Sequence, residues 1–293
     1  MRIIVDGSDE AFAWAIRSLT SRGFDVMAAI DRNATDAEIL WTGITTRIDE
    51  LVTKVYPSLR YVCCPATGID HIDVAGLNAR GVKVLSLRDC MDVIQGVSAT
   101  AEFTLYLILS SLRPTHTPKG YRQIGRDLKG KRVLVIGYGR IGKQVAKLCE
   151  AFGCIVDAID IGDRFRLNEA LSLADIVTLH VSLTPESEGM IGAVQFAAMK
   201  RNSILINTSR GKVIDEAALV HALTHGNTVR HAALDVHANE PGEPSPDIKR
   251  LAGTCLLTLT SHLGGYTVES RAATDRVLVE CLIKQIEADR GKD

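Results

Sequence analysis

The sequence has no excess of positive charge, few aromatic residues and no long apolar run. Its 34 lysines and arginines are balanced by 35 aspartates and glutamates, so it lacks the positive surplus needed to bind nucleic acid phosphates. The longest apolar stretch, Phe103 to Leu112, is too short to cross a bilayer and directly follows Glu102. A charge at Asp6 interrupts the N-terminal segment, which is not the pattern of a secretory signal. We expect neither nucleic acid nor a membrane as a partner.

The sequence also lacks the cysteine spacings of a metal site or a disulfide framework. Its seven cysteines are scattered, no CxxC pair occurs, and an odd number cannot all pair. The nearest candidate spacing, between Cys149 and Cys154, fits no zinc site. We therefore expect free thiols in a reducing compartment, which predicts a cytoplasmic protein without a bound metal.

Short apolar runs alternate with helical stretches along the whole chain. Each run has the length of a strand, and its apolar residues are continuous, as in parallel strands that helices cover on both faces. The runs span residues 3–5, 26–28, 39–41, 61–63 and 82–85, followed by 132–136, 155–159, 176–181, 204–207, 232–236 and 256–260. Alternation on this scale predicts the α/β class, with two doubly wound parallel-sheet domains.

A helix and a polar connector mark the predicted seam between these domains. Residues 99–112 have a helical pattern that ends just before Pro114, because proline disfavours helix at the residue preceding it. Residues 115–129 are polar and predict an irregular connector. Residues 267–289 predict one amphipathic helix that could return to the first domain. The expected domains are residues 1–95 with 266–293, and residues 96–265.

The strongest motif is KRVLVIGYGRIG, which follows an apolar run and precedes a helical stretch. Gly137 permits a tight turn, Gly139 lets the backbone approach a pyrophosphate, and Gly142 lets the helix pack closely on the strand. The next strand ends in Asp160, which can accept hydrogen bonds from both hydroxyls of an adenosine ribose. The order of strand, turn, helix, strand and acid predicts a Rossmann domain that binds NAD.

Two alternatives to this interpretation stay open. The glycines could form a merely structural turn beside a surface aspartate. Arg164 and Arg166 lie just downstream of Asp160 and could receive a 2′-phosphate, which would allow some use of NADP.

Five motifs occur in an order known from one protein family. They are ATGIDHID (residues 66–73), GYGRIG (137–142), INTSRG (206–211), ALDVHANEP (233–241) and TSHLGG (260–265). With these motifs the chain resembles the D-isomer-specific 2-hydroxyacid dehydrogenase family over nearly its whole length. The resemblance implies a Rossmann cofactor domain, a flavodoxin-like substrate domain and chemistry in the cleft between them.

The resemblance also assigns roles to residues of these motifs. Arg210 would bind the carboxylate and carbonyl of the substrate, with Glu240 and His262 completing the catalytic set. The backbone of Thr67 and Gly68 would receive the substrate carboxylate. The expected cofactor contacts are Gly137, Gly139, Arg140, Ile141, Gly142, Asp160, His180, Val181, Thr208, Ser209, Asp235 and Gly264. Among these, Asp235 would bind the nicotinamide carboxamide and His180 would lie at a strand end near the cofactor.

General chemistry supports the catalytic set independently of the family. Hydride transfer from a 2-hydroxy acid needs a base for the hydroxyl proton, and histidine suits reversible proton transfer near neutrality. A carboxylate bonded to that histidine would hold one tautomer and favour the imidazolium form. The planar fork of arginine matches a substrate carboxylate.

Each of these side chains also has a structural alternative. Arg210 could be a solvated loop arginine, Glu240 a surface acid and His262 a satisfied structural histidine. Asp235 could be a buried acid at a strand end, and His180 a core histidine. The four remaining histidines of the second half match no catalytic position and are expected on the surface; they are His221, His225, His231 and His237.

Three features depart from the family pattern. Ser182 stands where a proline usually follows the strand-end histidine, and the segment between Asp160 and Ala174 is shorter than usual. The loop segment WTGITT, with Trp41, lacks the arginine that phosphoglycerate-handling relatives tend to carry. A neutral or apolar substrate side chain is therefore favoured over a phosphorylated one, and the substrate stays open.

The sequence thus predicts an NAD-dependent oxidoreductase that interconverts a D-2-hydroxy acid and its 2-keto acid. The alternative is a non-catalytic NAD-sensing protein that resembles the dehydrogenase-like corepressors, since fold alone does not settle function. Residues 101–112 are apolar on more than one face, which predicts a homodimer through this helix and the connector 115–129. An interdomain core helix in a monomer is the alternative for that segment.

Overall fold

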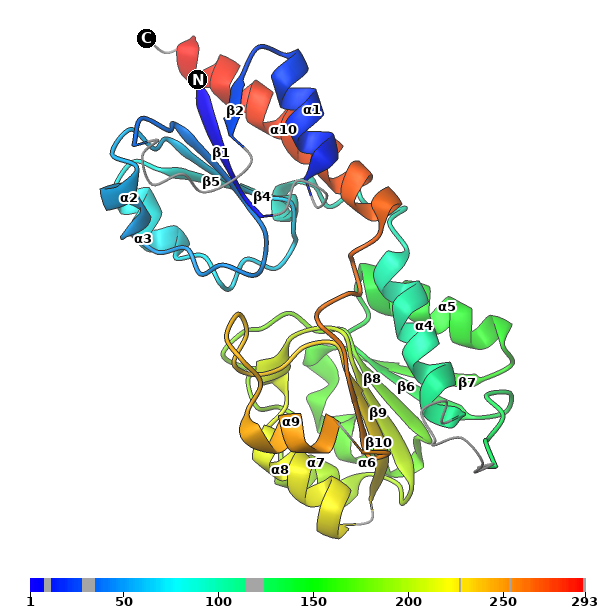
Figure 1. Ribbon diagram of the computed structural model, residues 1–293. Coiled ribbons are helices and arrows are strands. Elements are labelled where there is room, and N and C mark those ends of the chain that lie inside the picture. The colour runs from blue at the N-terminus through cyan, green and yellow to red at the C-terminus, as the bar shows by residue number, and fades with distance from the viewer. Residues whose placement is uncertain (8–11, 28–34, 114–123, 227, 253, 292–293) are drawn as a thin grey trace, which may run out of the picture. The chain divides into compact units, whose positions relative to one another are not determined.

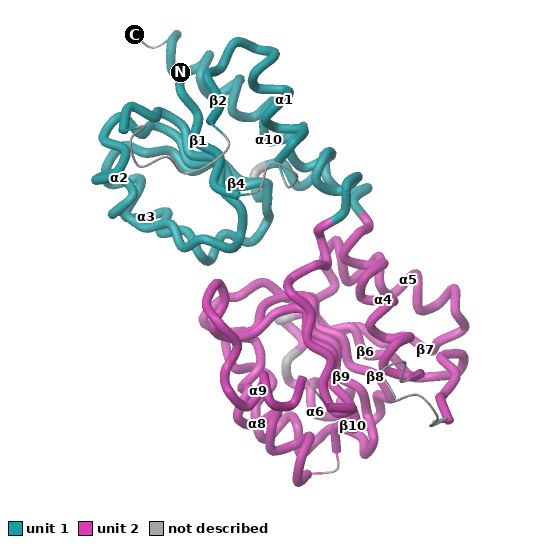
Figure 2. Tube along the Cα trace, in the orientation of Figure 1, with its two compact units in different colours: residues 1–97, 267–293 teal, residues 98–266 magenta. Residues whose placement is uncertain are grey.

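The computed structural model describes residues 1–7, 12–27, 35–113, 124–226, 228–252 and 254–291. These residues form two compact units, which Figure 2 shows in different colours. Unit 1 comprises Met1–Val97 and Thr267–Asp293, and unit 2 comprises Ser98–Tyr266. Unit 1 is therefore discontinuous in sequence, because its last helix comes from the end of the chain.

A five-stranded parallel sheet forms the centre of unit 1 (Figure 1). In chain order its strands are β1 (Arg2–Asp6), β2 (Asp25–Met27), β3 (Ile39–Thr42), β4 (Tyr61–Cys64) and β5 (Lys83–Ser86). Their spatial order is β2-β1-β3-β4-β5, with every neighbouring pair parallel. This is the order of flavodoxin-like sheets, in which the chain direction across the sheet reverses between the first and third strands.

Helices cover both faces of this sheet. One face packs against α1 (Ala13–Ser21) and α10 (Val268–Arg290), and the other against α2 (Val52–Val55) and α3 (Val74–Ala79). A short 3₁₀ helix, η1 (Leu87–Cys90), follows β5. Side chains alternate across β3, because Ile39 and Trp41 join the core under α1 and α10 whereas Leu40 joins the opposite core. Continuous apolar runs are thus buried on both faces of the sheet.

The terminal helix α10 is the predicted helix that returns to the first unit. It begins at Thr267, whose side chain accepts a hydrogen bond from the backbone N–H of Ser270 at 3.1 Å. Leu278, Val279 and Leu282 are fully buried in the core of unit 1. Near its other end the Asp289 carboxylate is bound by side chains of β4 and β5.

Unit 2 contains a six-stranded parallel sheet. Its strands are β6 (Arg132–Ile136), β7 (Ile155–Ile159), β8 (Ile176–Leu179), β9 (Ser203–Asn207), β10 (Val229–Leu234) and β11 (Leu257–Leu259). Their spatial order is β11-β10-β9-β8-β6-β7, again parallel throughout. The order reverses between β6 and β8, and ligands of such sheets bind beyond the carboxyl ends of the strands at that point.

The helices of unit 2 also lie on both faces of its sheet. One face packs against α4 (Ala99–Leu112) and α5 (Arg140–Ala151). The other carries α6 (Leu167–Leu173), α7 (Ala193–Ala198), α8 (Glu216–His221) and α9 (Pro246–Ala252). Three short helical segments complete the unit: η2 (Ile161–Arg166), η3 (Gly211–Val213) and the π-helical η4 (Ala222–Gly226).

The edge of the unit 2 sheet at β7 differs from the usual dinucleotide-binding order. That order places a third strand beyond the second one, whereas here the chain continues from β7 through η2 directly into α6. The short segment after Asp160, noted in the sequence, leaves no room for that strand. The two doubly wound parallel sheets confirm the predicted fold class. No helix among the described residues is both long and apolar enough to span a membrane.

Candidate active site

The glycine-rich turn follows β6, where the strand order of unit 2 reverses. Gly137 has φ +93°, a left-handed conformation that favours glycine, and its N–H donates to the Ile159 carbonyl at 2.8 Å. A Cβ on Gly137 would lie 2.6 Å from the carbonyl oxygen of His180, which follows β8. The turn is therefore pressed between the ends of β7 and β8, and only glycine fits there.

The other two glycines of the turn have different surroundings. A Cβ on Gly142 would overlap the carbonyl oxygen of Gly137, so this glycine lets α5 pack against the turn. Gly139 caps α5, and beyond its chain neighbours no atom of the described residues lies within 4 Å of the position its Cβ would take. The space beside Gly139 at the N-terminus of α5 is thus open, a geometry that fits a dinucleotide pyrophosphate.

The other residues expected near the dinucleotide have varied surroundings. Asp160 is exposed directly after β7, at the edge of the sheet. Arg140 opens α5, where burial lowers the pKa of its guanidinium, and the partly buried Ile141 packs against the core under α4. Val181 is 6% exposed and belongs to the core of unit 2, so its side chain is mainly structural.

His180 is held in a neutral form at the end of β8. Burial lowers its pKa to about 3. Its Nε2 lies 2.9 Å from the hydroxyl of Thr178, and its Nδ1 is buried without a hydrogen-bond partner among the described residues.

Asn207 organises the loop that carries Arg210. Its side-chain oxygen accepts hydrogen bonds from the N–H and the hydroxyl of Ser209, at 3.0 and 2.7 Å. Its amide nitrogen donates to the Arg210 carbonyl at 2.9 Å. Thr208 is tied to the other side of the unit by a 2.9 Å hydroxyl contact with Thr104 of α4. Both ends of the motif are therefore fixed, and the half-buried Arg210 side chain extends from a rigid base.

Asp235, at the end of β10, organises the loop that carries His262. Its carboxylate accepts hydrogen bonds from the hydroxyl of Thr260 at 2.6 Å and from the N–H groups of Leu263 and Gly264 at 2.8 Å. Burial raises the pKa of Asp235, and these hydrogen bonds oppose that shift. The backbone N–H of His262 donates to the Asp235 carbonyl at 2.9 Å. The side chain and the backbone of Asp235 thus both anchor this loop.

This loop holds His262 in an uncommon conformation. His262 has φ +57°, which is unfavourable for a residue with a side chain and persists only where the surroundings impose it. Its Nδ1 lies 3.0 Å from Oε2 of Glu240, and both side chains are 24% exposed. Since a carboxylate only accepts, the Nδ1–H of His262 donates to Glu240, and Nε2 is left for a ligand.

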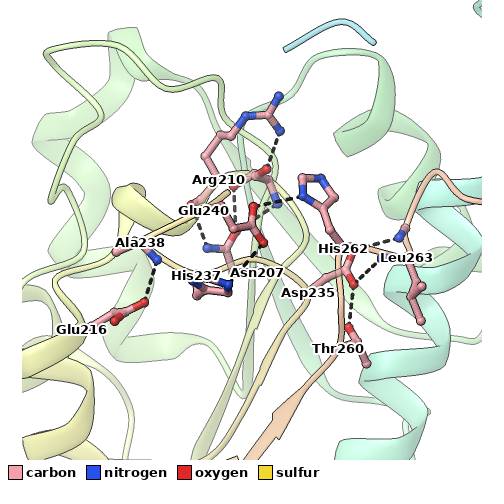
Figure 3. Close-up of polar contacts among 12 residues, drawn as sticks. Asn207, Arg210, Glu216, Asp235, His237, Ala238, Glu240, Thr260, His262 and Leu263 are labelled. Carbon is pink, nitrogen blue, oxygen red and sulfur yellow. Dashed lines mark hydrogen bonds and ion pairs between the residues drawn. The ribbon is translucent and has the colours of Figure 1, made fainter. Parts of the chain in front are cut away.

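Figure 3 shows how these side chains gather. Arg210 follows β9, Glu240 follows β10 and His262 follows β11. Three neighbouring strands therefore place the predicted catalytic set beyond their carboxyl ends, on the same side of the sheet. The Arg210 guanidinium donates to the Ser209 carbonyl at 2.8 Å. Thr67 and Gly68 belong to unit 1, where they follow β4 in a half-buried turn. Their expected role stays a prediction.

The structure corrects two sequence interpretations. His221 and His225 are exposed as expected, but His231 and His237 are not surface residues. His231 is bonded to the Cys255 carbonyl at 3.0 Å, and the side chain of His237 is only 10% exposed. The segment WTGITT was interpreted as a loop directly after a strand ending at residue 41, whereas β3 continues to Thr42 and Trp41 is fully buried.

Two supporting residues were missed by sequence reasoning. Asn207 is part of the INTSRG motif, so its position there was the available signal. Glu216 of α8 accepts hydrogen bonds from the Ala238 N–H at 2.7 Å and the Ser245 hydroxyl at 3.0 Å. It therefore clamps both ends of the loop that carries Glu240, and no sequence pattern links these distant positions.

Comparisons with known proteins identify one family. Residues 112–264 match the family model described as D-isomer specific 2-hydroxyacid dehydrogenase, NAD binding domain. The chain is 32% identical to D-3-phosphoglycerate dehydrogenase of Methanocaldococcus jannaschii over 286 residues, covering 88% of this chain and 51% of that protein. The chain thus spans about half the length of this relative and of similar curated relatives.

Other proteins match over most of their length. Glycerate dehydrogenase of Methylorubrum extorquens is 33% identical over 258 residues, covering 84% of this chain and 80% of that protein. Among solved structures, the TT0316 protein of Thermus thermophilus is similar, with a TM-score of 0.79 and 29% identity, covering 98% of this chain and 97% of that one.

Proposed function

The chain belongs to the D-isomer specific 2-hydroxyacid dehydrogenase family, and we propose that it is an oxidoreductase interconverting a D-2-hydroxy acid and its 2-keto acid. The cofactor is NAD, because residues 112–264 match the NAD-binding domain of that family. One observation carries the proposed activity above all. It is the 3.0 Å hydrogen bond between His262 and Glu240, at the edge of the sheet where Arg210 also emerges.

Each residue of the set has a role that follows from its surroundings. Glu240 accepts the Nδ1–H of His262 and so fixes the tautomer. Nε2 of His262 is then the nitrogen that donates a proton to the substrate oxygen during reduction and accepts it during oxidation. Arg210, on its rigid loop, binds the substrate carboxylate through its planar fork. When bound, the nicotinamide supplies or accepts the hydride.

The remaining assignments extend this proposal. Unit 2 is the cofactor domain, with Gly139 and the N-terminus of α5 at the pyrophosphate and Asp160 at the adenosine ribose. Thr208, Ser209, Asp235 and Gly264 line the nicotinamide side. Unit 1 is the substrate domain, in which the backbone of Thr67 and Gly68 binds the substrate carboxylate, as the family resemblance implies.

We further propose a cytoplasmic homodimer. No disulfide joins the cysteines of the described residues, which suits a reducing compartment. Helix α4 buries one face in unit 2 but leaves Tyr106 54% exposed, with Phe103 stacked on it at 5.6 Å. An apolar outer face supports association through α4. Most of the connector 115–129 lies outside the described residues, so it adds no support. Light scattering at micromolar concentration tests the dimer, and a monomer mass would exclude it.

A screen of NADH oxidation across 2-keto acids tests the activity and defines the substrate. The series carries apolar, hydroxymethyl and phosphorylated side chains, and reduction of at least one acid to its D-2-hydroxy product is expected. The neutral and apolar members should react better than the phosphorylated ones. A folded protein that binds NADH yet reduces none of them would instead be a nucleotide-sensing binding protein.

A further inference from the structure

His237 lies against the same carboxylate that holds His262. Its Nε2 is 4.0 Å from Oε1 of Glu240, while Oε2 of Glu240 is 3.0 Å from Nδ1 of His262. One carboxylate therefore lies between two imidazoles, with a different oxygen toward each ring (Figure 3). The side chain of His237 is 10% exposed, and its Nδ1 is buried without a hydrogen-bond partner among the described residues.

The backbone keeps His237 in this position. The N–H of Glu240 donates to the His237 carbonyl at 3.2 Å, which closes a turn between the two residues. The backbone N–H of Ala238, the residue after His237, donates a hydrogen bond to the Glu216 carboxylate at 2.7 Å. On the other side a Cβ on Gly211 would overlap the His237 carbonyl, so the backbone of the Arg210 loop packs directly on it. These contacts fix the backbone from which the His237 side chain extends toward Glu240.

The charges near His237 come from several elements. Glu240 and Glu243 share its loop, and the pKa of Glu243 is lowered chiefly by Lys249 and slightly by His237. Glu216 of α8 is engaged with Ala238 and Ser245. His262 faces the opposite oxygen of Glu240, and Asp235 faces His262 from the end of β10. Glu240 is thus the carboxylate that both imidazoles contact.

We propose that His237 is a positioning residue that acts through Glu240 and sets how firmly Glu240 holds the proton on His262. When His237 is protonated, its charge attracts Glu240 and competes with the Nδ1–H of His262 for this carboxylate. This competition weakens the hydrogen bond by which Glu240 stabilises the imidazolium of His262. The proposed coupling of the two rings thus runs through one shared carboxylate.

The ring resonances of the two histidines, followed by NMR across pH in the protein without substrate, test this coupling. Removing His237 by His237→Phe should move the titration midpoint of His262 to higher pH, by about half a unit to one unit. Removing His262 by His262→Asn should move the midpoint of His237 upward by the same amount, since coupling between two sites is reciprocal. Unmoved midpoints in both variants would overturn the proposal.

The path through Glu240 is tested by a double-mutant cycle. In a Glu240→Gln background, the effect of His237→Phe on His262 should shrink to less than half, because the shared charge is gone. An undiminished effect would show direct repulsion between the rings and would remove Glu240 from the proposal. Should His237→Phe not fold, His237→Gln serves in its place, since it keeps a polar side chain that cannot acquire charge.

The kinetic part of the inference rests on the proposed function. In keto acid reduction, the fall of kcat/KM with rising pH should move to higher pH in His237→Phe. The control His231→Phe changes another partly buried histidine of unit 2, and its profile should stay in place. If no keto acid is reduced, the NMR titration still decides the coupling. If reduction occurs and the midpoints do not move, the role of His237 fails while the proposed function stands.

Discussion

Unit 1 and unit 2 are both parallel sheets covered by helices, but they place polar side chains in different settings. In unit 1, Tyr61 of β4 and Lys83 of β5 bind Asp289 near the end of α10. In unit 2, Asn207 is the last residue of β9 and Asp235 directly follows β10, and both bind loop backbone instead. The first arrangement fastens a helix from the other end of the chain, and the second fixes loops that carry reactive side chains.

The two settings differ in how deeply their polar groups are buried, and therefore in how much each interaction contributes. Asn207 and Asp235 are 0% and 1% exposed, so their hydrogen bonds form in a medium where an unmade bond is costly. The ion pair of Lys83 with Asp289 lies nearer to solvent, with the lysine 46% exposed. Such a pair contributes less. We therefore expect changes at the strand ends of unit 2 to affect function strongly, and changes at the α10 contact to affect stability mildly.

Loss of the His262 imidazole should produce the largest effect. His262→Ala removes the group that donates the proton, so turnover should fall by about 10²- to 10⁴-fold at every pH. NADH binding, followed by its fluorescence, should survive because the glycine turn is untouched. His231→Ala is the matched control, because His231 lies within β10 and not at its carboxyl end, and it should keep near-normal turnover. Normal turnover in His262→Ala would remove the proposed acid–base role.

Neutralising Glu240 should change the pH dependence of the reaction. Glu240→Gln keeps a hydrogen-bonding side chain but removes the charge that favours the imidazolium of His262. The fall of kcat/KM for reduction should then begin about one pH unit lower, with activity at low pH partly retained. A merely structural Glu240 would lower activity without moving the profile, which the measured pH–rate curve distinguishes.

Asp160 should control cofactor choice from the edge of the sheet. Asp160→Ala removes an acceptor for the ribose hydroxyls, so NADH binding should weaken about tenfold. It also removes a charge that repels a 2′-phosphate, so the preference for NADH over NADPH should become smaller. Glu150→Ala is the control, since this exposed acid lies in the last turn of α5, away from the glycine-rich turn and from Asp160. Faster turnover of NADPH than NADH by the unaltered protein would contradict the role of Asp160.

The fold could be predicted because its signal is local and repeated. Runs such as residues 176–179 and 203–207 are mostly apolar, and every residue in them is buried in the structure. Order along the chain also placed Arg210, Glu240 and His262 after successive strands. Their contact geometry could not be predicted in the same way, because it depends on loop conformations such as φ +57° at His262.

Other features depend on interactions that no local pattern encodes. The burial of His237 follows from Glu216, which is distant in sequence and holds the neighbouring N–H. The end of β3 was placed one residue too early because a strand end is set by pairing, here of Thr42 with Asp6 of β1. The strand absent beyond β7 was visible in the sequence only as a short segment after Asp160.

The smallest predicted effect concerns the contact that fastens α10 to unit 1. Hydrogen bonds from Lys83 and Tyr61 hold the pKa of Asp289 well below its usual range, and burial together with the Asp289 bond raises the pKa of Tyr61 to about 12. Asp289→Asn removes the charge and should lower the Tm of unit 1 by a few degrees at pH 7. Both tryptophans, Trp14 and Trp41, belong to unit 1, so tryptophan fluorescence follows its unfolding alone.

The pH dependence of this difference gives the sharper test. Because the folded protein holds the pKa of Asp289 below that of the unfolded chain, its contribution is complete above about pH 5 and is lost as pH falls below about 4. The Tm gap between the unaltered protein and Asp289→Asn should therefore close in acid. Asp247→Asn changes an exposed ion pair of α9 in unit 2, with its partner Arg250 60% exposed, and should leave the tryptophan signal unmoved. A Tm gap that persists unchanged at pH 3 would mean that Asp289 acts by packing rather than by charge. The ion pair of Lys83 with Asp289 would then no longer distinguish unit 1 from unit 2.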